Sequence, residues 1–126
     1  MDLLFNIDVP DLDRAQALYV EAFELQLGRR FGDAVVELTG LPVQLYLLHK
    51  PAGTLGAGQA PRDYTRHWCP VHLDVVVDDL DAALARAERA GFVCEGAVRD
   101  EAFGRIVQLA DPFGHGWCLL EFSARG

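Results

Sequence analysis

The chain has 126 residues, of which 51% are hydrophobic and 24% charged, a balance typical of one globular domain. Its net charge is -8, with eleven basic residues scattered among nineteen acidic ones. Nucleic acids and anionic membrane surfaces are recognised by clustered Lys and Arg, so the composition argues against both as partners. No apolar stretch approaches the roughly 20 residues needed to cross a bilayer. No secretory signal is visible in MDLLFNIDVPDLD, and we expect a cytoplasmic protein.

The first 49 residues predict a strand, a helix and three further strands. In the first strand, Phe5, Ile7 and Val9 alternate with Leu4, Asn6 and Asp8, which gives two unlike faces. An apolar stripe from Leu12 to Phe23 then predicts a helix with Asp11 as its N-cap. Strand-like segments follow near 26–31, 34–39 and 43–49.

Residues 50–67, KPAGTLGAGQAPRDYTRH, contain Gly and Pro without periodicity and predict a linker or a flexible flap. The segment 68–126 then repeats the order of elements. A strand over 72–77 leads into a helix with Asp79 as N-cap and Gly91 as its end. Three strands are expected near 92–97, 105–110 and 116–122.

The two halves are related by an internal repeat. IDVPDLDRAQALY (7–19) aligns with VVVDDLDAALARA (75–87) at an offset of 68. AVVEL (34–38) aligns with RIVQL (105–109) at 71, and PVQLYLL (42–48) with GWCLLEF (116–122) at 74. Each half is therefore a βαβββ module. One module cannot bury its sheet and helix alone, so we expect a single domain over 1–126, with modules 1–49 and 68–126.

The strand–DLD–helix openings, VPDLDRAQALYVEAF and VVVDDLDAALARAERAGF, and the late ADPFGHGWCLLEF hairpin resemble the vicinal oxygen chelate superfamily. That superfamily includes glyoxalase I, bleomycin-resistance proteins and extradiol dioxygenases. The resemblance implies an α+β fold in which two βαβββ modules form a curved, eight-stranded mixed sheet around a concave cavity. It also implies a homodimer.

Metal-dependent members of this superfamily place one ligand on the first strand and one on the last strand of each module. Carried over by strand register, the four positions are Leu4, Gln44, His72 and Cys118. Leu4 cannot bind a metal, and a thiolate favours soft metals. His72 is the only good candidate ligand. We therefore expect no cofactor, although a divalent metal stays open.

Strand alternation predicts which side chains face the cavity. Asp74 shares a face with His72, and the repeat places Asn6 and Asp8 on the equivalent face of the first module. The predicted ligand-binding residues are Asn6, Asp8, Gln44, Tyr46, His72, Asp74 and Cys118. For Asn6, Asp8 and Asp74 the alternative is a structural role, in turn capping or in pairs with arginines. Trp117 is expected in the core, and no catalytic residue is assigned.

Three functions stay open. The first is a metal-free protein that binds a small molecule, like the bleomycin-resistance branch, with a neutral or cationic ligand favoured by the acidic chain. The second is a metal-dependent lyase, isomerase or dioxygenase that uses His72 as a ligand. The third is an interaction module without a small ligand. Whether the protein is an enzyme, and whether 50–67 closes as a lid, stay open as well.

Overall fold

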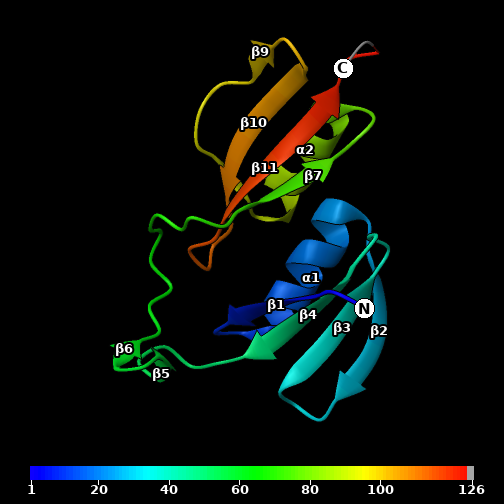
Figure 1. Ribbon diagram of the computed structural model, residues 1–126. Helices are drawn as coiled ribbons and strands as arrows, with labels where there is room; N and C mark the ends of the chain where they lie inside the picture. The colour runs from blue at the N-terminus through cyan, green and yellow to red at the C-terminus, as the bar shows by residue number, and fades with distance from the viewer. Residues whose placement is uncertain (125–126) are drawn as a thin grey trace. The chain divides into compact units, whose positions relative to one another are not determined.

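A computed structural model describes residues 1–124 (Figure 1). The chain forms two compact units, Met1–Tyr64 and a second unit that begins at Thr65. Each unit has one long helix and a mixed sheet, so the predicted α+β class is confirmed. No helix within residues 1–124 is both long and apolar enough to span a membrane.

The first unit is built in the predicted order. Its elements are β1 (Leu4–Val9), α1 (Leu12–Phe23), β2 (Gln26–Phe31), β3 (Val35–Thr39) and β4 (Gln44–His49). The strands lie in the order β1-β4-β3-β2, with β1 parallel to β4 and the other pairs antiparallel. Helix α1 packs on β3 and β4. It buries Leu12, Ala15, Leu18, Tyr19 and Ala22, as the apolar stripe predicts.

The segment expected to be a linker or a flexible flap contains a short hairpin in the first unit, β5 (Leu55–Ala57) and β6 (Ala60–Pro61). Arg62 ties this hairpin to the main sheet, because its Nε lies 2.8 Å from Asp8 Oδ2 in β1. The same guanidinium donates to the carbonyl oxygen of Leu55 (2.7 Å). Neither the long-range contact of Arg62 with Asp8 nor its contact with Leu55 is visible in a Gly/Pro-rich sequence, so the hairpin was not predicted.

The second unit repeats the topology of the first. It contains β7 (Leu73–Val76), α2 (Leu80–Ala90), β8 (Val93–Cys94), β9 (Arg99–Glu101), β10 (Gly104–Ala110) and β11 (Gly116–Phe122). Strands follow the order β7-β11-β10-β8, and β9 also pairs with β10. As β1 does with β4, β7 runs parallel to β11. The paired βαβββ modules are thus present, whereas one eight-stranded curved sheet stays a prediction.

Both helices begin where the sequence predicts. The carboxylates of Asp11 and Asp79 accept from the backbone N–H groups of Arg14 and Ala82, each at 3.1 Å. Helix α2 has a second acceptor at its start, because Glu121 in β11 accepts from the N–H of Leu80 (2.7 Å). At the other end Gly91 is the C-cap, with the positive φ of 128° that favours glycine.

Two expectations about the second unit are wrong. The strand expected over 92–97 spans only Val93–Cys94, and pairing with β10 resumes at Arg99, in a strand that was not predicted. Between these strands the chain turns away from β10, and the Cys94 thiol donates to the carbonyl oxygen of Gly96 (2.7 Å). The alternation of apolar residues does not predict a turn of this kind, because such a turn depends on contacts between a side chain and the backbone.

The last-strand register is also two residues off. Asn6 pairs with Tyr46, and its repeat partner Asp74 pairs with Cys118. Cys118 is therefore the counterpart of Tyr46, not of Gln44, and the offset between these strands is 72 rather than 74. An even shift keeps every side chain on its predicted face, so the alternation of apolar residues cannot detect it.

Candidate functional site

Three polar side chains form a row across the open face of the second sheet. Asp74 in β7 pairs with Cys118 in β11, which pairs with Gln108 in β10. Residues in register on neighbouring strands point to the same face. Helix α2 packs against β11, and the alternating partner Trp117 is 2% exposed. The predicted core position of Trp117 is confirmed.

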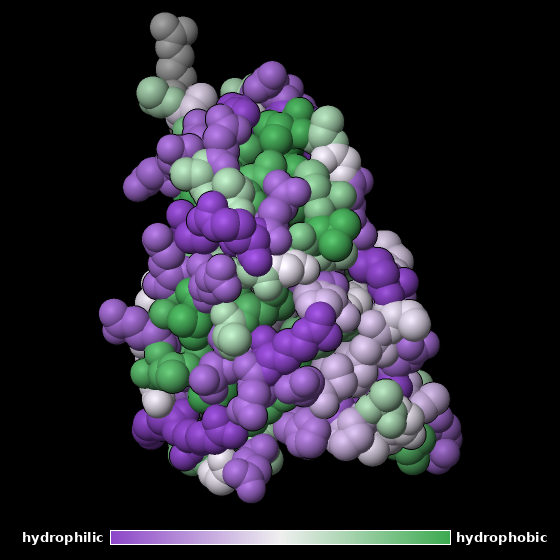
Figure 2. All heavy atoms as spheres, turned by 180° about the vertical axis from the view of Figure 1, so that it is seen from behind, coloured by the Kyte–Doolittle hydropathy of each residue, from purple (hydrophilic) through white to green (hydrophobic). Residues whose placement is uncertain are grey.

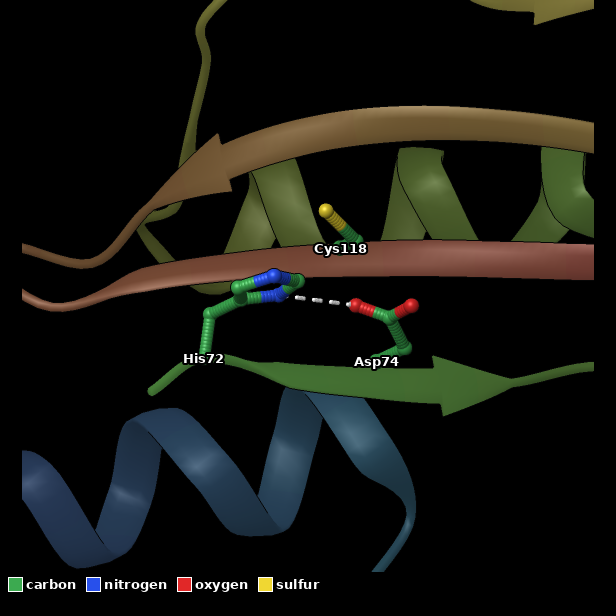
Figure 3. Close-up of side chains that lie close together, drawn as sticks. All are labelled: His72, Asp74 and Cys118. Atoms are coloured by element: carbon green, nitrogen blue, oxygen red, sulfur yellow. Dashed lines mark hydrogen bonds and ion pairs between the residues drawn. The ribbon is translucent and has the colours of Figure 1, made fainter. Parts of the chain in front are cut away.

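His72, directly before β7, joins this row. Its Nδ1 lies 3.2 Å from Asp74 Oδ1, and both side chains project from the same face (Figure 3). One ligand atom from each of His72, Asp74 and Cys118 lies within 4.8 Å of the others. The structure therefore brings together the three site residues predicted in this unit. The Asp74–His72 contact was left open by the strand spacing alone, because their backbones are two residues apart.

The thiol of Cys118 is held in its neutral form. Burial, followed by the charge of Asp74 and a hydrogen bond to it, raises the pKa of this thiol to about 11. Arg99 acts in the opposite direction and lowers this pKa. At pH 7 a thiol with such a pKa is ionised in roughly one molecule in 10⁴. Cys118 is therefore a poor nucleophile, since the thiolate is the reactive form.

A cavity of about 360 Å³ opens beside this row in the second unit. One side is formed by the extended segment that precedes β7, and the other by β9, β10 and β11. The lining residues are Arg66, Trp68, Cys69, Val71, His72, Arg99, Ile106, Gln108, Gly116, Trp117 and Cys118. The volume lies in the range of small-molecule pockets, and the mixture of apolar walls and a few polar groups is typical of them.

Arg66 holds the segment before β7 against the sheet. Its guanidinium makes two parallel contacts with the Glu95 carboxylate, Nε to Oε2 and Nη2 to Oε1, both at 2.9 Å. It lies directly over Gly116, where an added Cβ would be 2.6 Å from Arg66 Nη2. Gly116, the second glycine of DPFGHG, thus leaves the space that Arg66 occupies. The sequence offered no sign of this contact, because Arg66 lies in a segment without periodicity.

The equivalent row in the first unit is occupied differently. Asn6 pairs with Tyr46, which pairs with Glu37 in β3. The Tyr46 hydroxyl donates to Glu37 Oε2 at 2.6 Å, and Arg29 contacts both groups at 3.2 Å. These bonds, with Tyr46 first, lower the pKa of Glu37 to about 2. Glu37 is only 5% exposed, a buried carboxylate with its partners supplied.

Sequence reasoning did not select Glu37. The sequence feature that could have indicated this residue is a single acid in the apolar run AVVEL, at the position equivalent to Gln108. The other predicted residues of this unit lie at the surface or in ion pairs: Asn6 and Gln44 are exposed, and Asp8 is paired with Arg62. Asp8 therefore pairs with an arginine, which is the structural role given above as the alternative to ligand binding. The sequence did not indicate that this arginine is Arg62.

A divalent metal is common in the superfamily, and the donors available here can be tested against it. His72, Asp74 and Cys118 supply one nitrogen, one oxygen and one sulfur, a set of the kind that zinc accepts. His115 is engaged elsewhere, because its Nδ1 lies 2.8 Å from the buried Asp111 carboxylate. A metal that binds the Cys118 sulfur must displace the thiol proton. The raised pKa of this thiol opposes that displacement. Asp74 was not recognised as a metal donor from the sequence.

Comparison with known proteins places the chain in a family. The family described as a glyoxalase-like domain matches residues 5–120. An uncharacterised protein of Mycobacterium bovis is 32% identical over 122 residues, covering 90% of this chain and 78% of its own. An uncharacterised protein of Mycobacterium tuberculosis is also 32% identical, over 90% of this chain and 70% of its own.

Solved structures share the fold at lower identity. A glyoxalase/bleomycin resistance protein/dioxygenase family enzyme from Burkholderia phytofirmans matches with a TM-score of 0.75 and 17% identity, covering 98% of this chain and 100% of its own. The antibiotic-binding protein TnmS3 from a Streptomyces species matches at 0.67 and 24%, covering 98% and 96%. With its family match, its repeated modules and its open-face row of polar residues, the chain belongs to the glyoxalase-like domain family of the vicinal oxygen chelate superfamily.

Proposed function

We propose that this protein binds a small organic molecule in the cavity of its second unit, without a resident metal. The observation that carries the proposal is the cavity itself, about 360 Å³ with apolar walls and the polar groups of His72 and Gln108. A few fixed polar groups on an apolar surface orient a ligand, and the apolar area supplies the affinity.

Both tryptophans of the chain, Trp68 and Trp117, line this cavity. Intrinsic fluorescence therefore reports directly on the proposed site. We expect saturable quenching by 1-naphthamide, a neutral aromatic probe of suitable size. Replacing the exposed Trp68 by Phe should reduce the amplitude of the quenching and leave the contribution of Trp117, if the probe enters the cavity. Quenching that is linear and unsaturable in the folded protein contradicts the proposal.

The alternative function is that of a metal-dependent enzyme. The observation that favours it is the convergence of His72, Asp74 and Cys118. A divalent ion held by these residues would supply Lewis-acid polarisation of a substrate oxygen. His72, Asp74 and Cys118 would each contribute one donor atom, and Gln108 would lie beside them in the same row.

Metal analysis of the purified protein separates the two functions. The metal-free proposal predicts less than stoichiometric metal in the wild type and no change in H72A. The matched control is H49A, which removes an exposed histidine at the end of β4 in the first unit. Stoichiometric metal that is retained in H49A and lost in H72A would overturn the proposal in favour of the enzyme.

A homodimer, supported by the family resemblance, and a cytoplasmic location, expected from the sequence, are the remaining proposals. Light scattering tests the first, since one chain has a mass of 13.9 kDa. A mass near 28 kDa, twice this value, is expected. A constant single-chain mass at all protein concentrations contradicts the dimer.

A further inference from the structure

The charge of the cavity lining differs from that of the whole chain. The chain has a net charge of -8, yet within residues 1–124 no aspartate or glutamate lines the cavity, whereas Arg66, His72 and Arg99 do. The carboxylates beside these groups are paired with them: Glu95 with Arg66, Asp74 with His72 and, at 4.0 Å, Glu101 with Arg99. A ligand in this cavity therefore meets guanidinium and imidazole groups rather than carboxylates. This reverses the ligand charge expected from composition.

The three basic groups differ in how strongly they are already paired. Arg66 is committed to Glu95 through two bonds of 2.9 Å, and it also shapes the cavity wall over Gly116. Arg99 has a much weaker partner, with its Nε 4.0 Å from Glu101 Oε1 and its side chain 65% exposed. Of the three groups, Arg99 therefore gives up the weakest existing contact when it pairs with a ligand anion. If the anion is a carboxylate, the guanidinium can bind it in bidentate geometry.

Aromatic surface lies in the same lining. The Trp68 residue is 81% exposed, an unusual position for a large indole unless another group covers it. Figure 2 shows polar and apolar side chains intermixed on the face opposite to the view of Figure 1, so exposed apolar groups alone do not single out a site. Trp68 differs because it shares a cavity with a weakly paired arginine. An indole face binds planar rings well, and Ile106 adds apolar area.

We propose that the ligand is a small aromatic carboxylate, whose anion pairs with Arg99 and whose ring lies against Trp68. This inference rests on the proposed binding function and specifies its substrate class. Gln108 is the neutral polar group of the lining and can donate to the same anion through its amide.

Three probes with one ring system test the charge preference: 1-naphthoate, 1-naphthamide and 1-naphthylmethylammonium. Titration calorimetry with the full chain gives an affinity for each. We expect 1-naphthoate to bind at least about tenfold more tightly than the amide, because a hydrogen-bonded ion pair exceeds a neutral contact by about that factor. The ammonium probe should bind most weakly.

Variants of Arg99 identify the recognising group. R99A should weaken 1-naphthoate about tenfold and leave 1-naphthamide unchanged, and R99E should shift the preference to the ammonium probe. R89A is the matched control, because Arg89 is an exposed arginine on α2 and does not line the cavity. Circular dichroism verifies the fold of each variant.

The outcomes separate the two proposals. If all three probes bind equally, or if R99A leaves 1-naphthoate binding intact, the aromatic-carboxylate inference fails while small-molecule binding stands. If R89A weakens 1-naphthoate as much as R99A does, the preference comes from overall charge and the role of Arg99 is wrong. If none of the probes binds the folded protein, both proposals fail.

Discussion

At the scale of single residues, the environments of Cys118 and Glu37 are opposite although the two occupy related rows of the repeat. Burial and the nearby Asp74 keep the Cys118 thiol neutral, whereas hydrogen bonds from Tyr46 and Arg29 keep the Glu37 carboxylate ionised. The difference lies in the neighbouring groups. Hydrogen-bond donors stabilise the charged form of the carboxylate, whereas a negative carboxylate beside a thiol disfavours the charged thiolate. Each case leads to a measurable pH dependence.

Cys118 should react slowly with iodoacetamide at pH 8, and Cys69, which is exposed, should react faster. D74N should lower the pKa of Cys118 below its wild-type value of about 11, because the charge of Asp74 is lost while burial remains. The rate of alkylation of each cysteine against pH, followed by mass spectrometry, gives this value. The control is D78N, which removes an exposed acid beyond β7. An unchanged profile in D74N refutes the influence of Asp74.

Glu37 should make the stability of the protein depend on pH in acid. Its pKa falls from 4.5 to about 2 in the folded chain, so its contribution is present above pH 4.5 and is lost as pH falls toward 2. Urea unfolding at a series of pH values should show a smaller loss in E37Q than in the wild type over this window. Y46F should raise the pKa of Glu37, because the Tyr46 hydroxyl is its strongest donor. Parallel profiles for E37Q and the wild type contradict this account.

At the residue scale, the sequence predicted which side chains share a face but not which of them touch. Alternation placed Asp74 and His72 together, and the structure brings them within 3.2 Å. Glu37 was not predicted as part of a polar network, because the sequence around a lone acid in an apolar run shows no hydrogen-bond donor for it. Its donors, Arg29 and Tyr46, lie on two other strands. Contacts between strands depend on register, which the pattern within one strand does not contain.

At the scale of elements, the segment from Thr65 to His72 has no regular structure yet forms one side of the cavity. Its position depends on Arg66, which joins Glu95 and lies over Gly116. The apolar pattern predicts strands and helices because these bury a periodic face. A segment held by one charged side chain has no such signature. The predicted linker includes only residues 65–67 of it, and residues 68–72 were assigned to the second module.

G116A should release this segment. The new methyl group would stand 2.6 Å from Arg66 Nη2 and 3.0 Å from its Cζ, so the guanidinium must leave its place over the strand. Hydrogen exchange of residues 65–72 should accelerate, and stability should fall by no more than about 1 kcal/mol, the usual size of a partly exposed ion pair. G96A is the control, since nothing lies within 4 Å of its added Cβ. Equal exchange in the two variants argues against the Arg66 contact as the anchor.

At the scale of the whole molecule, two copies of one topology carry unlike polar rows. Asn6, Tyr46 and Glu37 in the first unit correspond to Asp74, Cys118 and Gln108 in the second. In the first unit the polar group of Glu37 has its hydrogen-bond partners within the unit, because Tyr46 and Arg29 donate to its carboxylate. The row of the second unit borders a cavity. The proposed ligand site therefore belongs to one copy of the repeat.

Without a resident metal, the stability of the whole protein should not depend on chelators. We expect the midpoint of thermal unfolding to be the same before and after treatment with EDTA, for the wild type and for H72A alike. A ligand that binds only the folded state raises this midpoint, so removal of a tightly bound metal lowers it. A lower midpoint after EDTA in the wild type, absent in H72A, would support the metal-dependent alternative.

The sequence by itself determined the modules of this protein, because strand and helix periodicity, N-cap aspartates and a repeated DLD turn are local properties. It also determined the face on which His72, Asp74 and Cys118 lie, since alternation survives an even error in register. Only the tertiary structure decided that Cys118 is the counterpart of Tyr46, that Arg66 closes one wall of the cavity and that Arg99 is weakly paired beside Trp68. These features depend on which distant side chains meet, and on the pKa and pairing that follow from the meeting.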